Sequence, residues 1–294
     1  RQDKVKFVDL VFTDIQGIIK NVTIPMSYLK DSLEHGTWFD GSSIEGFTRI
    51  AESDMYLRPD PSTYAVLPWS DEEHRTLRLI CDVCKPDGTP FEGCPRNILK
   101  KACKQAAELG FTMNVGPELE FFLFKKKPLS EIRAEGLTPH DSTGYFDLAP
   151  SDAAADIRAE ILHALEAMGI EVEMSHHEVG PGQHEIDFRY DDAVKTADNA
   201  ITLKQVIKTI AHKHGLHATF MPKPLVGENG SGMHTHQSLA DKNTGHNLFH
   251  GEGTYNLSEV ARSYLAGIIK HIRPLSAVMS PTVNSYKRLV PGYE

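Results

Sequence analysis

The sequence predicts an α+β fold, in which a sheet backed by helices follows a smaller, strand-rich domain. Two observations lead to this prediction. Residues 5–83 contain strands and turns, whereas from Pro95 onward three helices each end at a glycine and are each followed by a strand-like segment. The stretch KPDGTPFEGCP, rich in proline and glycine, separates the two patterns, so we place the domains at residues 1–94 and 95–294.

The first domain contains short runs of β-branched and aromatic residues bounded by turn signals. The predicted strands are VKFVDLVFTD, IIKNVTIP, TYAVLPW and TLRLICDV, at residues 5–14, 18–25, 63–69 and 76–83. A polar, glycine-rich passage lies between the second and third of these.

The second domain begins with a helix over residues 95–110, which has a proline near its start and Gly110 at its end. Its apolar stripe consists of Ile98, Leu99, Ala102, Cys103, Ala106 and Leu109. Two further helices are predicted, one from Ser151 to Gly169 and one ending at Gly215. The strand-like segments that follow the three helices are 111–124, 170–179 and 216–225, and a last helix over 258–274 precedes a loop that carries NSYKRLVPGYE.

Composition excludes several classes of function. With 40 acidic and 31 basic residues the formal charge is -9, and no basic stripe with interleaved aromatics points to nucleic acid. No apolar run reaches the roughly 20 residues that a membrane span needs, and the start lacks the apolar stretch of a secretory signal. We therefore expect a cytoplasmic protein with no membrane partner. From the missing initiator methionine and the abrupt end at VPGYE, we expect both ends to be cut.

The four cysteines do not form a convincing metal motif. Cys81 and Cys84 have C-x2-C spacing, but no second such pair follows, and on a strand the two thiols would face opposite sides. Free, buried thiols in a reducing compartment are the expectation.

Paired carboxylates interrupt an otherwise apolar strand at GPELEFFLF. Read at period two, Glu118 and Glu120 share one face, while Leu119 and Phe121 share the other. An ionised carboxylate is too costly to bury without a partner, so this face must meet a cation, a basic group or water. A strand end open to solvent is the alternative for an isolated E-x-E.

Two other segments each carry potential ligands. In SHHEVGPGQHEIDF, GPGQ predicts a hairpin turn that would bring Glu178 and Glu185 together, flanked by His176, His177 and His184. In NGSGMHTH, His234 and His236 are two apart and would share a strand face. Each pattern alone also fits polar strand surface or structural histidines.

Taken together, these segments favour a divalent metal centre. Carboxylates with one or two imidazoles suit Mg²⁺ or Mn²⁺ better than zinc or copper. Without a cation, two carboxylates about 4 Å apart repel by roughly 4 kcal/mol at an effective dielectric near 20. We expect two ions. From residue types alone, a binuclear metallohydrolase is the leading interpretation.

Three loops carry further polar residues. WFDGSSIEGF, at residues 38–47, is polar and bracketed by aromatics, which is unusual for a passive linker. ENGSGM is similar to a glycine-rich anion loop, but no G-x-x-x-x-G-K-[ST] sequence occurs in the chain, and a simple turn is the alternative. KRLVPGYE fits either an anion-binding lid or a solvated loop.

Six motifs together resemble glutamine synthetase of the bacterial and archaeal type I form. They are FDGSSIEGF, GPELEFFLF, HHEVGPGQHEIDF, KHGLHATFMPKP, NGSGMHTH and NSYKRLVPGYE, in the family's order from about residue 5 to the end. The resemblance implies an N-terminal β-grasp domain, then a catalytic α+β domain whose antiparallel sheet is backed by helices. It also implies a homo-oligomer, a dodecamer of two stacked hexamers, with active sites between neighbouring subunits.

The resemblance assigns the metal ligands by matching position. Glu120, Glu178 and Glu185 are implied as ligands of one Mg²⁺ or Mn²⁺ ion. Glu118 and His234 are implied as two ligands of the other. On this view the two acids of the E-x-E strand serve different ions.

The resemblance also implies substrate and catalytic positions. Asp40 would bind ammonium, take its proton, and reach the active site of the adjacent subunit. Asn229, Gly230 and Arg288 would hold L-glutamate, and Glu294 lies in the loop that closes over it. Asp40, Arg288 and Glu294 are thus the implied catalytic residues.

Four further positions are implied to bind ATP, the second substrate. They are Glu173, Tyr190, His236 and Ser238. The implied reaction converts the γ-carboxylate of glutamate to a γ-glutamyl phosphate, from which ammonia displaces phosphate to give glutamine.

The chain departs from the family at its end. The family continues beyond PGYE and there supplies a third ligand for the second metal and several arginines, so we expect this chain to be part of a longer enzyme. Three alternatives remain open: a ligase that joins glutamate to another amine such as a polyamine, a non-catalytic relative, and the metallohydrolase. The ammonium pocket around Asp40 favours ammonia over other amines, and retention of the acidic pairs disfavours a non-catalytic relative.

Overall fold

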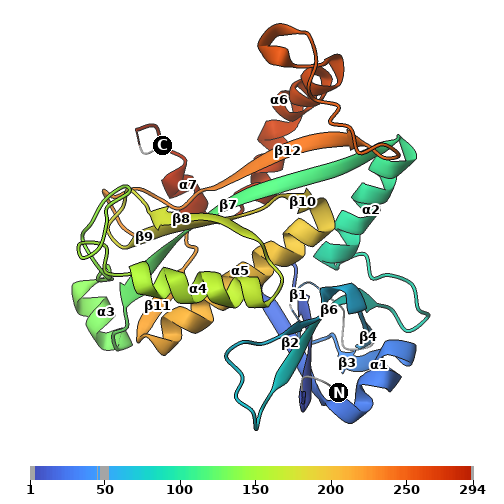
Figure 1. Cartoon of the computed structure of the whole chain (residues 1–294), viewed down its shortest axis with the longest axis horizontal. Coiled ribbons are helices and arrows are strands. Elements are labelled where there is room, and N and C mark those ends of the chain that lie inside the picture. The colour runs from blue at the N-terminus through green and yellow to red at the C-terminus, as the bar shows by residue number, and fades with distance from the viewer. Residues whose placement is uncertain (1–3, 45, 47–52, 293–294) are drawn as a thin grey trace. The chain divides into compact units, whose positions relative to one another are not determined.

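The computed structural model describes residues 4–44, 46 and 53–292, and the chain divides into two compact units (Figure 1). The first unit comprises Arg1–Leu109, Glu166–Ile170 and Ala193–Thr202, and the second comprises Gly110–Leu165, Glu171–Asp192 and Leu203–Glu294. Two long helices therefore contribute residues to both units.

The first unit is built on a mixed sheet with the strand order β2-β1-β6-β4-β3, with β5 paired to β6. Its strands are β1 (Phe7–Thr13), β2 (Ile19–Pro25), β3 (Thr37–Asp40), β4 (Asp54–Pro59), β5 (Ala65–Val66) and β6 (Thr76–Cys84). The central pair β1 and β6 is parallel, and the other pairs are antiparallel. All four predicted strands are confirmed, although the third is only two residues long.

Short helices and one long helix accompany this sheet. They are η1 (Met26–Tyr28), α1 (Leu29–His35), η3 (Pro61–Thr63) and α2 (Pro95–Glu108). The core beneath them is formed by alternate residues of the strands, including Val8, Leu10, Leu57, Leu79 and Val83. The α2 prediction is confirmed, and Pro95 occupies its first turn as expected.

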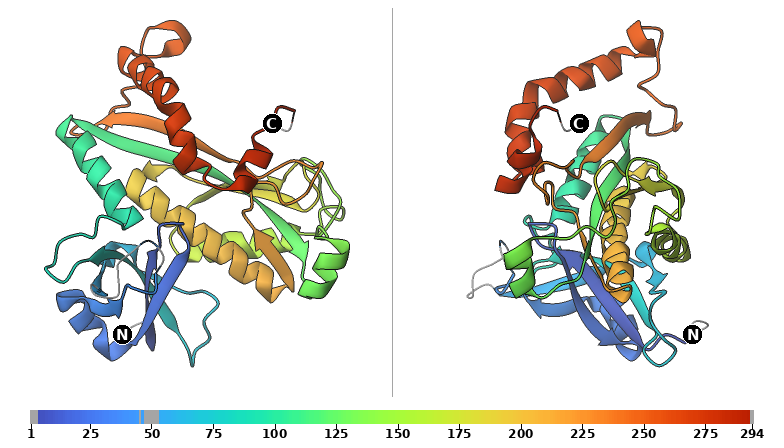
Figure 2. Two further views of the ribbon diagram at one scale, coloured as in Figure 1. Left: turned by 180° about the vertical axis from the view of Figure 1, so that it is seen from behind. Right: turned by 90° about the vertical axis from the view of Figure 1, so that its left-hand side faces the viewer.

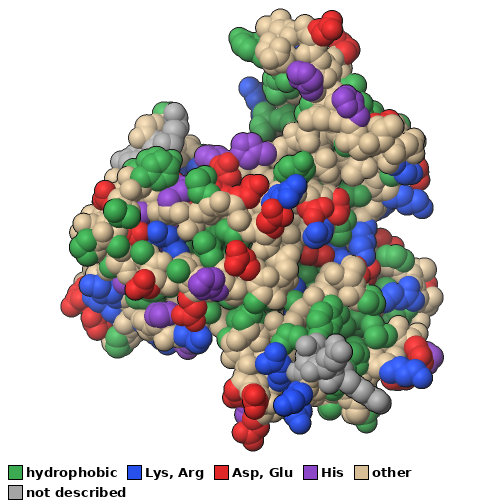
Figure 3. Space-filling model, in the orientation of Figure 1, with side chains coloured by type: hydrophobic (Ala, Val, Ile, Leu, Met, Phe, Trp, Pro, Cys, Tyr) green, Lys and Arg blue, Asp and Glu red, His purple; other side chains and the backbone are tan. Residues whose placement is uncertain are grey.

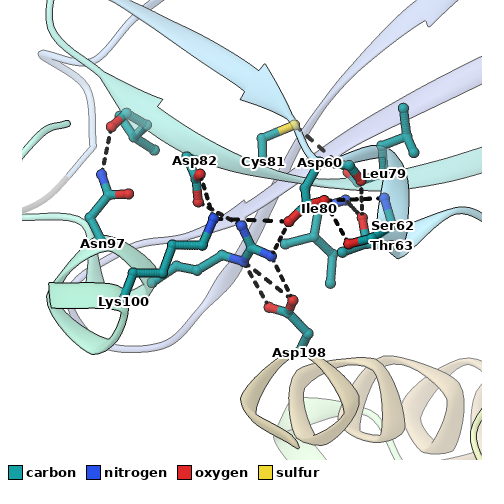
Figure 4. A network of polar contacts seen from close by, with 12 residues as sticks. Asp60, Ser62, Thr63, Leu79, Ile80, Cys81, Asp82, Asn97, Lys100 and Asp198 are labelled. Carbon is teal, nitrogen blue, oxygen red and sulfur yellow. Dashed lines mark hydrogen bonds and ion pairs between the residues drawn. The ribbon is translucent and has the colours of Figure 1, made fainter. Parts of the chain in front are cut away.

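A network of charges links α2 to the sheet and to the α5 residues of this unit (Figure 4). Arg96, of which only 8% of the side chain is exposed, contacts Asp60 at 2.7 Å, Asp82 at 2.6 Å and Asp198 at 2.8 Å. Lys100 reaches Asp82 at 2.6 Å. Because three carboxylates share these two cations, none of these charges is buried without a partner.

The second unit is built on an antiparallel sheet around the long strand β7 (Phe111–Lys125). The other strands are β8 (Val172–His177), β9 (Gln183–Phe188), β10 (Asp191–Asp192), β11 (Leu216–Thr219) and β12 (Met233–Asp241). Both β9 and β12 pair with β7 at Glu118, so they lie on opposite edges of it. The predicted antiparallel sheet is thus confirmed, and β7 is its centre.

The helices of the second unit are α3 (Leu129–Glu135), α4 (Ala155–Ala167), α5 (Ala193–Lys213), η4 (Thr254–Asn256), α6 (Glu259–Met279) and α7 (Val283–Arg288). Figure 1 shows α4 and α5 running alongside the sheet, whereas α6 projects away from it in both views of Figure 2. Contacts place α4 on the face opposite Glu118 and Glu120, because its Arg158 meets His184 of β9. Among the described residues, no helix combines the length and the apolar character required to span a bilayer.

Three helix predictions in this unit need correction. The helix expected from Ser151 begins at Ala155, because the buried Asp152 accepts a hydrogen bond from the N–H of Ala154 and holds a turn there. Helix α6 continues through Pro274 to Met279, although a proline inside a helix removes a backbone donor and crowds the carbonyl four residues earlier. The segment expected as a loop after it forms α7, which a capping box between Thr282 and Ser285 starts.

Candidate active site

The candidate site lies on one face of β7, where acidic and apolar residues alternate. Leu119 and Phe121 are buried on the face that the helices cover. Glu118 and Glu120 point to the other face, as period two predicts. The strand therefore presents two carboxylates on the side away from α4.

The register of the sheet places each carboxylate of β7 in a row with side chains of the neighbouring strands. One row runs from Asp187 on β9 through Glu118 to His234 on β12. Residues paired directly across antiparallel strands have Cβ atoms roughly 4.5–5.5 Å apart, so these side chains are neighbours.

The second row lies two residues further along β7. It runs from His176 on β8 through Glu185 on β9 to Glu120. We call the side chains of these two rows, together with Glu178 and His236, the carboxylate face. Figure 3 shows acidic and histidine side chains close together near the left-hand end of β12.

Both histidines of the H-x-H motif contact one carboxylate. His234 Nδ1 lies 3.0 Å from Glu118 Oε2, and His236 Nε2 lies 2.5 Å from Glu118 Oε1. Burial alone would raise the pKa of Glu118, but these hydrogen bonds outweigh it and lower the pKa. The predicted sharing of a strand face by the two histidines is confirmed.

The GPGQ turn brings Glu178 and Glu185 together as predicted. Gln183 donates its N–H to the carbonyl of Gly180 at 2.9 Å, which closes the turn between β8 and β9. His176 then lies between the two acids, 3.6 Å from Glu178 and 3.5 Å from Glu185. His177 and His184, which also flank the acids in sequence, pair with each other on the opposite face.

The carboxylates destabilise one another's ionised forms. Burial, the contact with Glu178 and the charges of Asp187 and Glu120 raise the pKa of Glu185 to about 9. Burial and the charge of Glu118 raise the pKa of Asp187 to about 6. Burial likewise raises the pKa of Glu120. Such a concentration of buried acids calls for a positive partner.

The donor set suits a hard divalent cation. Potential ligand atoms of His176, Glu178 and Glu185 lie within 4.8 Å of one another, and the nearby Glu120 adds a further carboxylate. Oxygen-rich sites with few imidazoles are typical of Mg²⁺ and Mn²⁺. The residues therefore fit the expected ions, with Glu118 and His234 forming an adjacent ligand pair.

Arg288 at the end of α7 lies beside this face, over two glycines. A Cβ at Gly230 would meet Arg288 Cγ at 2.9 Å, and one at Gly232 would meet Arg288 Nη2 at 2.6 Å and Glu120 Oε1 at 3.0 Å. Arg288, Glu120 and Gly232 also line a cavity of about 530 Å³. Only glycine allows the guanidinium this close approach. Asn229 precedes these glycines in the same loop and is half-buried.

Two of the predicted nucleotide positions meet at Gly116 of β7. A Cβ added there would lie 3.2 Å from Tyr190 Cβ and 3.9 Å from His236 Cβ. Ser238 lies on β12 opposite Asn114, and Glu173 is exposed on β8. Tyr190 is also exposed, so this end of the face is open to a ligand.

The sequence matches two domain families over most of its length. The catalytic domain of glutamine synthetase matches residues 92–294, and its β-grasp domain matches residues 4–86. The chain belongs to the glutamine synthetase family. The expected fold, a β-grasp domain followed by the catalytic α+β domain, is confirmed.

Individual glutamine synthetases are similar over the whole chain. That of Clostridium saccharobutylicum is 54% identical over 295 residues, and that of Methanosarcina mazei is 53% identical over 299 residues. Each alignment covers 100% of this chain but only 66% and 65% of the two relatives, respectively. The chain thus spans about two thirds of the length of the curated relatives.

Solved structures show the same similarity. The glutamine synthetase of Plasmodium falciparum, solved by cryo-electron microscopy, superposes with a TM-score of 0.89 at 34% identity, covering 100% of this chain and 62% of that one. A GmaS complex with ADP superposes with a TM-score of 0.90 at 34% identity, covering 99% and 66%.

The glutamine synthetase resemblance also singled out Asp40 and Glu294. Asp40 belongs to the first unit, is exposed at the end of β3, and accepts hydrogen bonds from the N–H and Oγ of Ser42 at 2.8 and 2.7 Å. These bonds lower the pKa of Asp40, so it is ionised at neutral pH. Glu294 lies outside the described residues.

Two residues of the candidate site were not predicted from the sequence. Asp187 follows Glu185 by two residues, and the period-two rule applied to HEIDF would have placed both on one face. Gln183 donates its side-chain amide to Glu120 at 2.8 Å and to the carbonyl of Gly230 at 3.2 Å. Only the tertiary pairing of β7 with β9 shows that role.

Proposed function

We propose that this chain is part of an enzyme that ligates ammonia to the γ-carboxylate of L-glutamate, giving L-glutamine, ADP and phosphate at the expense of ATP. The observation that carries the proposal is the carboxylate face, built by the strand register of a glutamine synthetase catalytic domain. The reaction would pass through a γ-glutamyl phosphate.

The residues of the carboxylate face would hold two or more divalent cations. We assign Glu120, Glu178 and Glu185 to one ion, and Glu118 and His234 to the other. Bound Mg²⁺ or Mn²⁺ would neutralise charge on the phosphoryl group during transfer. The choice between the two metals is left to experiment.

The chain's own side chains would position the substrates. Arg288, Asn229 and Gly230 would hold glutamate, and the guanidinium would offset the negative charge that develops at its γ-carboxylate. Asp40 would bind ammonium and accept its proton, so that ammonia can attack, with Glu294 in the loop that closes over the site.

The nucleotide would lie at the open end of the face. We assign it to Tyr190 and His236, which meet at Gly116, together with Glu173 and Ser238. The exposed positions of Glu173 on β8, Tyr190 after β9 and His236 on β12 would leave room for a planar base.

Assembly and location follow the same proposal. We propose a homo-oligomer, a dodecamer, in which Asp40 serves the active site of the neighbouring subunit. We also propose a cytoplasmic location, no nucleic-acid or membrane partner, and a functional domain boundary near residue 94.

The test is ADP release by the purified natural protein with Mg²⁺ and ATP, adding glutamate and ammonium separately and then together. Turnover that requires all components supports the synthetase. Turnover with another amine but not with ammonium would reassign the chain to a sibling ligase. Hydrolysis without ATP dependence would favour a metallohydrolase, and metal binding without turnover a non-catalytic relative.

A further inference from the structure

On the opposite side of the sheet from the carboxylate face lies a second, largely buried polar cluster. His177 and His184 form a cross-strand pair on the opposite side of the β8–β9 hairpin, and neither is exposed. Each immediately precedes a residue of the carboxylate face: His177 precedes Glu178, and His184 precedes Glu185. The pair is therefore built into the backbone that carries two proposed metal ligands.

One carboxylate oxygen of Asp141 contacts a residue at each end of the turn. It lies 3.0 Å from His177 Nε2, before the turn, and accepts the N–H of Gly182 at 3.0 Å, after it. His177 also donates through Nδ1 to the carbonyl of Glu178 at 2.7 Å. Asp141 thus holds residues 178–182 from outside the hairpin.

Gly182 makes this close approach possible. Its φ is +68°, and a Cβ there would meet the carbonyl oxygen of Leu123 at 2.7 Å and the N–H of His140 at 3.1 Å. No side chain fits between the turn and the segment that carries Asp141. The local sequence is therefore suited to holding the turn tightly.

The second histidine is held from α4. Arg158 donates to His184 Nδ1 at 3.1 Å and to Asp152 at 2.6 and 3.0 Å. Both Arg158 and Asp152 are buried, and the rings of His177 and His184 meet edge to face at 4.7 Å. This contact links the hairpin to the start of α4.

Potential ligand atoms of Asp141, His177 and His184 also lie within 4.8 Å of one another, which raises a metal ion as an alternative occupant. The contact with Arg158 argues against it. Because a guanidinium can only donate, His184 Nδ1 accepts, and its proton is on Nε2, where a metal would have to bind. The fixed positive charge of Arg158 beside the ring opposes a cation further.

We propose that Asp141 is a positioning residue that holds the turn 178–182, and with it Glu178, in the geometry that binds the divalent cation. The proposal rests on the proposed function of the carboxylate face. Without the hydrogen bonds to Asp141, repulsion among Glu120, Glu178 and Glu185 would open the hairpin. Partners that orient a metal ligand typically contribute about 10–100-fold in metal affinity.

The test compares three variants of the purified natural protein by Mn²⁺ titration followed by electron paramagnetic resonance. Asp141→Ala removes both hydrogen bonds and is expected to weaken Mn²⁺ binding about 10–100-fold. Asp141→Asn keeps an acceptor oxygen for Gly182 and is expected to stay within about threefold of wild type. The matched control is Asp14→Ala, because Asp14 is also buried and accepts two backbone N–H bonds at 2.9 Å in another turn.

Hydrogen exchange over residues 178–183 in metal-free protein gives a second readout. It should quicken in Asp141→Ala but not in Asp14→Ala. If Asp141→Ala changes neither the hydrogen exchange of this segment nor the Mn²⁺ affinity, the proposal is overturned. Equal weakening of Mn²⁺ binding in Asp141→Asn and Asp141→Ala overturns it as well. A saturating Mn²⁺ count that falls by one ion would instead show that Asp141 is itself a ligand. If wild type binds no Mn²⁺, the proposed function fails, while the exchange result still decides whether Asp141 holds the turn.

Discussion

Glu185 is costly to ionise in the folded protein, because burial and the other acids of the carboxylate face raise its pKa. Its pKa is raised to about 9, first by burial and then by neighbouring acids, whereas an unfolded chain returns it to its ordinary value of 4.5. Between these two values the native state binds the extra proton. The metal-free native state therefore loses stability relative to the unfolded state as the pH rises through this range.

This difference fixes the sign of a pH dependence. In the presence of a chelator, the free energy of unfolding should fall as the pH rises from about 5 to 9, because the native state binds more protons than the unfolded state in this window. Urea unfolding at several pH values measures it. Glu185→Gln cannot titrate and should flatten the profile; the same slope in this variant as in wild type would refute the assignment to Glu185.

Asp187 is expected to lower the stability of the metal-free protein while it strengthens Mn²⁺ binding. Its pKa of about 6 reflects burial first and then repulsion from Glu118. Asp187→Asn should raise the free energy of unfolding of the metal-free protein at pH 8 by about 1–3 kcal/mol, since two pKa units correspond to roughly that much. It should also weaken Mn²⁺ binding. Lower stability with unchanged Mn²⁺ affinity would show that Asp187 is only structural.

At the scale of elements, Arg96 joins α2 to the sheet of the first unit and to Asp198 of α5. Removing one partner of a buried charge network leaves the others uncompensated, at a cost of about 3–5 kcal/mol. Arg96→Ala should therefore lower the free energy of unfolding by about that amount, as measured with urea. Lys100→Ala is the control: its side chain is 37% exposed, so a cost of about 1 kcal/mol or less is expected. Equal costs for the two variants would contradict this view of the network.

The loop before β12 depends on close packing at Gly232. An added methyl group would press on Arg288 and Glu120, so Gly232→Ala should cost about 1–3 kcal/mol and weaken Mn²⁺ binding. Gly267 lies within α6, where an added Cβ would have open space within 4 Å, so Gly267→Ala should instead stabilise by about 0.5–1 kcal/mol. Thermal unfolding with and without Mn²⁺ compares the two. A neutral Gly232→Ala would show that Arg288 moves freely.

Local sequence patterns predicted where the helices and strands lie better than they predicted which residues of other elements these contact. Alternation placed Glu118 and Glu120 on one face, and GPGQ placed the hairpin, because both signals lie within a few residues. The start of α4 was wrong because Asp152 bonds locally and to Arg158, which the helical periodicity does not show. Gln183 was missed because its contact with Glu120 depends on which residues of β7 lie opposite, and pairing between distant strands leaves no mark on either segment alone. Alternation in HEIDF places Asp187 on the face of Glu185, but its position opposite Glu118 depends on the same pairing.

For the whole molecule, metal binding and folding should be coupled. A cation that binds only the native state stabilises it by about 2.7 kcal/mol at 100 times its Kd. Adding a chelator should therefore lower the melting temperature of the native protein, and Mn²⁺ should restore it. Differential scanning calorimetry measures both steps. In Glu120→Gln the same treatment should have a smaller effect; an identical response would place the cation elsewhere.

The carboxylate face as a divalent-cation site of a glutamine synthetase is tested most directly by counting bound Mn²⁺ in the purified natural protein. Equilibrium dialysis should find at least two ions per chain in wild type, and fewer or much weaker ions in Glu185→Gln. Absence of tight Mn²⁺ binding, or a count and affinity unaffected by Glu185→Gln, would contradict the account.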